Sequence, residues 1–588
     1  MKIFNIKSIA CVALMSLAMT SCSDYLDCPT EDAINSSNFY KTDAQARAGV
    51  NYLYNSPWYD FQRGFFKVGE VLAGNYYWGG SPYLTFTLTG GDDDLSNMSA
   101  SLWAVNTHSI TVYDNLKNST GPSEAVKNAC MGECLTWKAF AYFYLVRSFG
   151  SVPIVNNPIE LINNQQATTL HKAKISNVYD YIIMTLEKAI SLLPEKDETG
   201  MGRIDRYAAK ALLAKVYLTK AGFSEDYTEY KKGSYSYIIC KAHKRNQADL
   251  DKAAELALDV IENSGRHLEN KYSDIFRGDH NVCDENLISW AWTAQGNWTH
   301  QNSLQSDLGM NGFDEFGDNW GQWNGPSVDL QDAFGENALS KDRQNTDDRR
   351  KATMMMAGDT YDYFYTDCGG FNYLKFIYGD YPDHISDGKM ESPTGAASVK
   401  HLYGDNADHI KYFGTSAGRM ASSLRTHLLR LADVYLIYCE AKIGDNGSTT
   451  DPKALQYFYD VRHRSVKGYD KLPTSLTWED VWKERRLELA CEGDRWYDFV
   501  RRYYYDPQGA ISELKGQRRN TYNGLDDLYK EYYKNGNWNV TSSQSYDTKA
   551  TVNITDQSFT LPLPSSDVIY NPLLLEAPED FDLSTITF

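Results

Sequence analysis

The densest group of ionisable side chains runs from Glu484 to Asp498, with the sequence ERRLELACEGDRWYD. Glu484 and Glu488 are one helical turn apart, and two carboxyl groups about 5 to 9 Å apart could hydrolyse glycosidic bonds. Arginines interleaved at helical spacing would pair with these carboxylates and lower their pKa values, which makes poor general acids. We therefore predict structural ion pairs here rather than catalysis. Partners are expected from an earlier apolar helix, at Arg430, Asp433 and Glu440.

Other motifs with catalytic or metal-binding potential are incomplete. Gly414–Gly418 (GTSAG) matches the G-x-S-x-G elbow of serine hydrolases, but only His427 and His463 follow it, both within expected helices. We interpret it as a turn of small residues. The acidic run at Gly91–Asp94 lacks the ligand spacing of a calcium loop, and the chain has no HExxH zinc motif. We predict no catalytic residue, metal or cofactor.

Ten cysteines are scattered along the chain, which is not the pattern of a disulfide scaffold. Cys130 and Cys134 lie four apart in a helical pattern without a C-x-x-C pair or a histidine cluster beside them. Apart from Cys11 and Cys22 near the N-terminus, we interpret all of them as small buried apolar residues.

Aromatic clusters beside amides and glycines offer a different chemistry. They occur at Asn75–Gly80 (NYYWGG) and Asn319–Gly325 (NWGQWNG). Sugar rings stack their C–H faces on indoles, and their hydroxyls need polar partners such as amides. We predict stacking by Trp78, Trp320 and Trp323, and hydrogen bonding by Asn75, Tyr77 and Asn324.

A third aromatic cluster joins Trp290 and Trp292 with Trp298. Trp290 and Trp292 alternate as in a strand, and core packing is the better interpretation for these two.

Helical periodicity positions these clusters and falls into two blocks. Helices are predicted near 123–148, 176–193, 206–221 and 249–263, and then near 424–442, 451–464 and 477–502. Paired helices with short breaks indicate a mainly α, tetratricopeptide-like repeat scaffold. We expect a helical scaffold over 46–265 with an aromatic loop near 75–97, an irregular and partly β ligand-binding insertion over 266–423, and closing helices over 424–588.

The N-terminus carries export signals. Lys2 and Lys7 precede a short apolar run that is typical of a signal peptide and too short to span a bilayer. The following LAMTSC resembles a bacterial lipobox ending at Cys22. We predict a signal peptide over 1–21, lipidation of Cys22 and a tether over 22–45.

Composition limits the partners. The 588 residues carry a net charge of −19, which argues against nucleic acid and, more weakly, against polyanionic glycans. Aromatic residues make up 13% of the chain and include 43 tyrosines. The tyrosine hydroxyl makes this side chain suitable for partly solvent-exposed binding surfaces.

Several segments together resemble the SusD/RagB family of outer-membrane nutrient-binding lipoproteins. The chain departs from the usual family ending, with Glu576–Glu579 (EAPE) in place of a Gln-Asn-Pro-Gly type sequence. The similar segments are Ser23–Asp27 after the lipobox, Gly132–Arg147 (GECLTWKAFAYFYLVR), Ala208–Tyr217 (AAKALLAKVY), Leu429–Tyr435 (LRLADVY), Glu484–Asp498, Leu561–Pro564 and Asn571–Pro572.

The resemblance implies a surface lipoprotein at the outer membrane that captures oligosaccharides and delivers them to a SusC-like TonB-dependent transporter. It implies no enzymatic activity. The negative charge of the chain favours neutral oligosaccharides. Two alternatives stay open: capture of peptides, as in the RagB branch, and, less favoured, a surface glycoside hydrolase.

Overall fold

The computed structural model describes residues 39–588, except 232–234, 295–297, 315–319, 342, 344, 380, 382–387, 419 and 549–551. The predicted signal peptide, Cys22, Cys28 and the tether up to residue 38 lie outside the described residues. Among the helices of the described ranges, none has the length and apolar character needed to cross a membrane.

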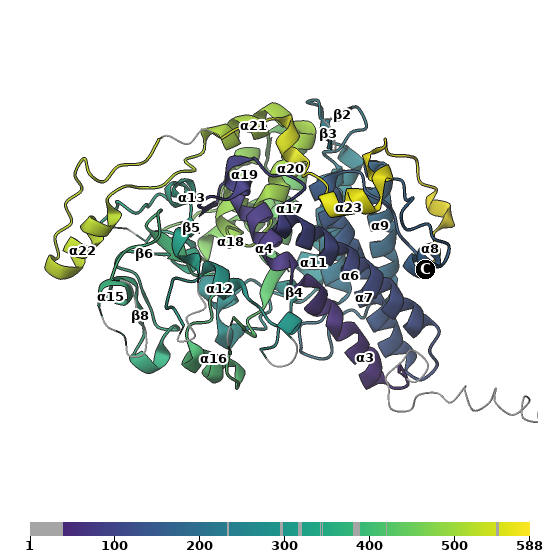
Figure 1. The fold of residues 1–588 in the computed structure, drawn as a ribbon, viewed down its shortest axis with the longest axis horizontal. Helices are drawn as coiled ribbons and strands as arrows, with labels where there is room; N and C mark the ends of the chain where they lie inside the picture. Colours follow the sequence, from purple (N-terminus) through teal and green to yellow (C-terminus); the bar gives the residue numbers. More distant parts are fainter. Residues whose placement is uncertain are drawn as a thin grey trace, which may run out of the picture.

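Long antiparallel helices form one half of the molecule (Figure 1). Consecutive helices pack against each other, as α6 does with α7 and α10 with α11, and α11 also packs against α17 from the other side of the insertion in the sequence. From Ala129 to Phe149 every residue of α7 is buried, so this helix lies at the centre of the scaffold. The predicted tetratricopeptide-like class is confirmed. The helices are α3 (Asp43–Asn51), α6 (Asp93–Lys117), α7 (Glu124–Phe149), α8 (Pro158–Asn163), α9 (Ile175–Leu192), α10 (Arg206–Lys220), α11 (Gln247–Asn263), α17 (Leu431–Ile443) and α18 (Pro452–His463).

Two predicted helices differ from the structure. The segment near 424–442 begins as strand β10 (Thr426–Arg430), and α17 follows it. The segment near 477–502 is divided into α19 (Trp478–Glu488) and α20 (Arg495–Tyr505). The break contains Cys491 and Gly493, both with positive φ. A Cβ on Gly493 would lie 2.1 Å from the ring of Phe65, so only glycine allows this close approach.

The segment 266–423 has the irregular character that its composition predicts. It consists of short helices and two-stranded antiparallel sheets joined by turns. Its elements are β4 (Asn286–Trp290), α12 (Leu304–Leu308), β5 (Asn324–Pro326), α13 (Val328–Ala333), α14 (Asp348–Thr353), β6 (Met354–Met356), β7 (Thr360–Tyr361), β8 (Phe371–Asn372), α15 (Tyr373–Tyr378), β9 (Ala396–Ser398) and α16 (Asn406–Phe413).

Two of the sheets tie this insertion to the scaffold. Strand β1 (Tyr76–Trp78) pairs antiparallel with β5, and β4 pairs antiparallel with β10. Trp290 of β4 is fully buried against Trp58, Phe61 and Phe65, which confirms its assignment to the core. The remaining elements are α4 (Phe61–Phe66), α5 (Pro82–Thr85), β2 (Thr228–Lys231), β3 (Ser236–Ile239), β11 (Ser448–Thr449), β12 (Leu476–Thr477), α21 (Pro507–Gly516), α22 (Leu525–Asn535) and α23 (Ser565–Tyr570).

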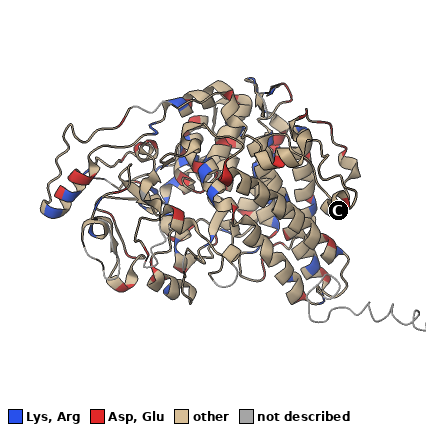
Figure 2. Cartoon of the chain, in the orientation of Figure 1, with Lys and Arg blue, Asp and Glu red and all other residues tan. Residues whose placement is uncertain are grey.

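A buried ionic network lies between α19 and its neighbours. Figure 2 shows acidic and basic segments side by side in the region of α17 to α19. Glu488 accepts from Arg349 at 3.0 Å and from Arg464 at 2.5 Å, and Arg430 contacts Glu492 at 2.7 Å. Burial would raise the pKa of Glu488, but the surrounding arginines hold it at about 2. The predicted structural ion pairs are confirmed, and Glu488 is no general acid at neutral pH.

Two of the three predicted partners are confirmed as well. Asp433 accepts from Arg485 at 2.6 Å, and Arg430, at the end of β10, contacts Glu492, as predicted. Glu440 pairs instead with Arg245 at 3.0 Å and with Arg501, which lie outside the Glu484–Asp498 segment. Ser416 of the GTSAG motif lies in a turn after α16, where its hydroxyl donates to Asn406 Oδ1 at 2.9 Å. The interpretation of that motif as a turn is also confirmed.

Cysteine burial follows the prediction in part. Cys130, Cys134, Cys240, Cys439 and Cys491 are buried free thiols. Cys283 and Cys368 are only partly buried; Cys283 lies in the irregular segment before β4, and Cys368 ends the short 3-10 helix Thr366–Cys368 before β8.

Candidate functional site

The two predicted aromatic clusters meet at one short sheet. In the register of β1 and β5, Trp78 lies opposite Asn324, and Tyr77 lies opposite Gly325. Beyond the sheet, the amide of Gly79 donates to the carbonyl oxygen of Trp323 at 3.5 Å. Residues some 250 positions apart in the chain thereby form one surface. We call Trp78, Trp320 and Trp323 the tryptophan platform.

The three indoles of the platform differ in exposure. Trp323 is 65% exposed and Trp320 is 45% exposed, which is unusual for side chains of this size. Trp78 is half-buried, and the Nζ atom of Lys67 lies over its ring, 4.8 Å from the ring centroid. Exposed indoles carried on segments that meet at one short sheet are suited to stacking against a ligand's flat apolar face.

Main-chain contacts to α12 hold the exposed indoles in place. The amide of Trp320 donates to the carbonyl of Ser306 at 2.7 Å, and that of Gly321 donates to Gly309 at 2.8 Å. A Cβ on Gly321 would lie 2.5 Å from the carbonyl carbon of Leu308, so the turn depends on glycine at this position. The backbone of the turn that carries Trp320 is therefore fixed by its contacts with α12.

The two predicted asparagine ligands are placed differently from the prediction. Asn75 is fully buried, and its amide donates to Glu70 at 2.9 Å and accepts from Arg486 at 2.8 Å. Asn324 is 4% exposed; it accepts from Tyr76 at 2.8 Å and donates to the carbonyl of Asp307 at 3.0 Å. Both side-chain amides form hydrogen bonds within the protein that fix the two strands, so they position the platform rather than contact a ligand.

Tyr77 lies on the other face of β1, because neighbouring side chains of a strand alternate. Its ring packs against the turn at Gly79: a Cβ atom added to Gly79 would lie 3.5 Å from the Cε1 atom of Tyr77. Burial first, and then the charge of Asp547, raises the pKa of its hydroxyl. The hydroxyl stays a neutral donor at the edge of the platform, not part of the face that Trp78 presents.

A row of polar residues beside the platform escaped the sequence interpretation. Over 61–71, Arg63 and Lys67 are the residues that are not buried, and Tyr59 precedes them by one turn. Arg63 holds Asp307 of α12 through two nitrogens, with Nη2 to Oδ1 at 2.7 Å and Nε to Oδ2 at 3.0 Å. The spacing of four between Tyr59, Arg63 and Lys67 in an otherwise apolar run is a signal that could have found them.

Trp298 extends this row. It is 52% exposed, and its ring packs edge to face with Tyr59 at 6.1 Å between centroids. Figure 1 shows α4 and α12, which carry Arg63 and Asp307, next to each other in the middle of the molecule. The surface from Trp298 past Arg63 to the platform is thus a line of rings interrupted by one half-exposed guanidinium.

The charges along this surface are paired. Lys67 contacts Asp94 at 2.5 Å, and the salt bridge to Asp307 raises the pKa of Arg63. Burial raises the pKa of Asp307, and Arg63 opposes this effect. In the part of the chain that the structure describes, no cluster of His, Cys, Asp or Glu could hold a metal ion. The arrangement offers stacking and hydrogen bonding to an uncharged ligand.

Comparison with known proteins gives the class. The model of the SusD family matches residues 261–579, and a model described as "Starch-binding associating with outer membrane" matches residues 94–218. The chain belongs to the SusD family.

Individual relatives agree with this assignment. A SusD-like protein of Bacteroides ovatus is 31% identical over 98% of this chain and 99% of its own length. A crystal structure described as containing a xylogluco-oligosaccharide is 28% identical, with a TM-score of 0.75 over 92% of this chain and 99% of that one. A laminarin-binding SusD-like protein, 20% identical, shares the fold, with a TM-score of 0.59 over 90% of this chain and 98% of that chain.

Proposed function

We propose that this protein binds neutral oligosaccharides on the tryptophan platform and delivers them to a SusC-like TonB-dependent transporter of the outer membrane. Family membership and the relative solved with a xylogluco-oligosaccharide support the ligand class. The family description that mentions the outer membrane supports the location. A lipid on Cys22 would tether the chain at the cell surface.

The observation that carries the proposal is the exposure of Trp320 and Trp323 on a rigid turn beside Trp78. A folded chain exposes indoles at a cost, and here main-chain hydrogen bonds fix the backbone of Trp320 and Gly321 that carries the exposed turn. An open surface rather than a deep pocket also suits a segment of a longer polymer, whose two ends must leave the site. Arg63 would supply hydrogen bonds to hydroxyl groups at one margin of the platform.

Calorimetric titration of residues 23–588 against neutral plant and microbial oligosaccharides tests the proposal. Replacement of either Trp320 or Trp323 by alanine should weaken binding about ten-fold, the equivalent of roughly 1.4 kcal/mol. The melting temperature should not change, because both rings are largely exposed. Tyr533→Ala is the matched control, because Tyr533 is 40% exposed on α22, away from the platform in Figure 1.

The outcomes separate the alternatives. Undiminished affinity in both tryptophan variants would contradict the platform. Binding of peptides but not sugars would favour the RagB-like alternative, and release of reducing ends by the purified protein would favour a hydrolase. Delivery is tested by co-purification of the full-length lipidated chain with the transporter from membranes, and its absence would refute that part of the proposal.

A further inference from the structure

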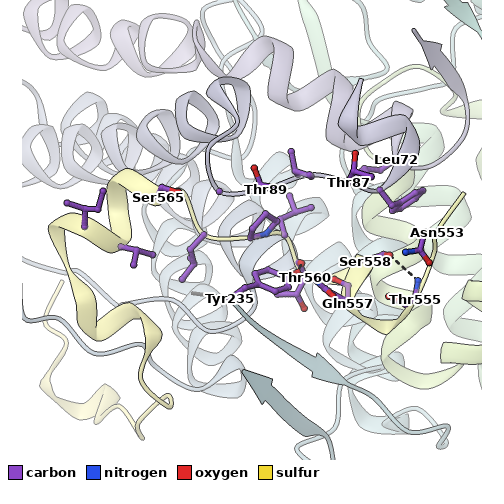
Figure 3. Close-up of a pocket in the computed structure, with 18 residues that line it drawn as sticks. Leu72, Thr87, Thr89, Tyr235, Asn553, Thr555, Gln557, Ser558, Thr560 and Ser565 are labelled. Carbon is purple, nitrogen blue, oxygen red and sulfur yellow. Dashed lines mark hydrogen bonds between the residues drawn. The ribbon is translucent and has the colours of Figure 1, made fainter. Parts of the chain in front are cut away.

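A cavity of about 680 Å³ lies apart from the platform. Its walls are the segment 86–90 after α5, the segment 553–569 up to α23, and Tyr235 at the start of β3. Figure 3 shows Thr87 and Thr89 on one wall, with Tyr235, Gln557 and Thr560 facing them across the cavity. In Figure 1, α23 and the platform elements β5 and α12 lie on different sides of α4. The volume falls in the range of small-molecule sites.

The lining of this cavity is uncharged throughout. None of its residues is Asp, Glu, Lys, Arg or His, although charged residues make up 23% of the chain. Half of the lining residues carry a hydroxyl or a side-chain amide, and most of the rest are aliphatic or aromatic. A charged ligand would lose its hydration here without gaining a counter-charge, so the walls select a neutral one.

The mixture of hydroxyl groups and apolar patches on the walls indicates which class of neutral ligand the cavity would bind. Sugar rings present hydroxyls at their edges and C–H groups on their faces, and so they need both kinds of wall at once. Thr89, Asn553 and Thr555 are exposed at the cavity, where they can exchange hydrogen bonds with such edges. Phe86 and Leu88 offer apolar contacts on the same wall.

The walls are held rigidly by packing behind them. Phe559 stacks on Tyr503 with centroids 4.0 Å apart, and on Trp496 at 5.4 Å. The Tyr235 hydroxyl donates to the carbonyl of Gln557 at 2.9 Å, and the amide of Ser565 donates to the carbonyl of Gly90 at 2.7 Å. A preformed cavity of this kind binds without the cost of ordering its walls.

We infer that this cavity, the C-terminal pocket, is a second binding site for a neutral oligosaccharide, built from 86–90, 553–569 and Tyr235. It shares no lining residue with the tryptophan platform. The inference does not depend on the platform, because it rests on the shape and chemistry of this cavity alone.

The test uses protein with the platform disabled. Residues 23–588 carrying Trp320→Ala and Trp323→Ala are titrated calorimetrically with oligosaccharides from xyloglucan, laminarin and starch, and with a charged oligogalacturonate. One neutral class should bind with a stoichiometry of one, and the oligogalacturonate should not bind. Thr89→Trp, which places an indole at the mouth, should then weaken this binding at least ten-fold.

A control and a second measurement protect the result from misfolding. Thr107→Trp introduces the same side chain at an exposed position of α6 outside the lining, and affinity should not change. If Thr89→Trp lowers the melting temperature, the test of this variant is replaced by hydrogen-exchange measurements on the platform-disabled protein that retains Thr89. The bound sugar should slow exchange within 553–563.

Three results would overturn the inference: no neutral oligosaccharide binds the platform-disabled protein, Thr89→Trp leaves its affinity unchanged, or an uncharged peptide binds in place of the sugar. Sugar binding that the two tryptophan substitutions abolish would leave the platform proposal intact and refute the pocket. Sugar binding that is unchanged by the two tryptophan substitutions but disappears with Thr89→Trp would support the pocket and refute the platform proposal.

Discussion

Glu70 couples the stability of the fold next to the platform strand to pH. It lies in the π-helical turn Lys67–Val71, fully buried, and accepts from Asn75 at 2.9 Å and from the amide of Gly493 at 2.7 Å. Burial raises its pKa from 4.5 to about 7, although both hydrogen bonds oppose the shift. The folded protein therefore holds a proton on Glu70 at mildly acidic pH, where the unfolded chain has released it.

The sign and size of the effect follow from this difference. Below pH 4.5 both states are protonated, and Glu70 adds no pH dependence. Between pH 4.5 and 7 the unfolded chain alone ionises at this residue, so the free energy of unfolding falls, and above pH 7 the decline stops. A shift from 4.5 to about 7 corresponds to about 3 kcal/mol in total.

Glu70→Gln removes the titration and mismatches one hydrogen bond. The Gln oxygen can accept from Gly493, but its NH₂ group then faces the NH₂ of Asn75, at a cost of about 1 to 3 kcal/mol. At pH 5 the variant should be the less stable protein. Between pH 5 and pH 7.5 the stability difference from wild type should move in the variant's favour by about 2 kcal/mol, because part of the titration lies outside this range.

Urea unfolding at a series of pH values between 5 and 7.5 measures this difference. Val71→Ala, a neighbouring buried and uncharged replacement, should be destabilised by the same amount at every pH. A Glu70→Gln offset that is equally constant would refute the assignment of a buried, protonated carboxyl.

Other predictions address the ionic network, the guanidinium beside the platform and the tether. Glu488→Gln should lower the free energy of unfolding at neutral pH by about 3 to 5 kcal/mol, because it removes a buried carboxylate that Arg349, Arg430 and Arg464 share and leaves less negative charge to balance them. With a folded pKa of about 2, the stability that Glu488 provides is complete above pH 4.5 and is lost as pH falls toward 2, which acid unfolding of both proteins would show. Arg63→Lys, which loses the two-point contact to Asp307, should weaken oligosaccharide binding by roughly 1 kcal/mol in titration without a change in fold. Cys22→Ser should abolish fatty-acid labelling and release the chain from the membrane fraction, and persistent labelling would contradict the lipobox.

Helix periodicity predicted much of the scaffold, and its failures have physical causes. The segments near 176–193 and 249–263 match α9 and α11 within two residues because each has one apolar face. Helix α6 was missed because its polar residues, such as Asn106 and Ser109, are buried too, so no apolar stripe marks it. The break between α19 and α20 was missed because it depends on the contact of Gly493 with Phe65, which is distant in sequence.

The sequence predicted which residue types gather at the candidate site, but not which of them face solvent and which hold the strands together. Indoles next to glycines predicted stacking by Trp320 and Trp323; the structure exposes both rings, and their role in binding stays a prediction. The same reasoning failed for Asn75 and Asn324, because an amide beside an aromatic cluster is equally useful to the protein's own strands. The antiparallel pairing of β1 with β5, which unites the clusters, leaves no local signal in either strand.

The distance along the chain between β1 and β5 has a consequence for folding. As the chain emerges during synthesis or export, Trp58, Phe61 and Phe65 appear long before Trp290, against which they pack in the core. The turn that contains Glu70 likewise needs the amide of Gly493, which is synthesised much later. Contacts of such large sequence separation form late and leave apolar surface open in the meantime. The platform should thus mature last, and chains truncated before residue 493 should be targets for chaperones and proteases rather than shortened binding proteins.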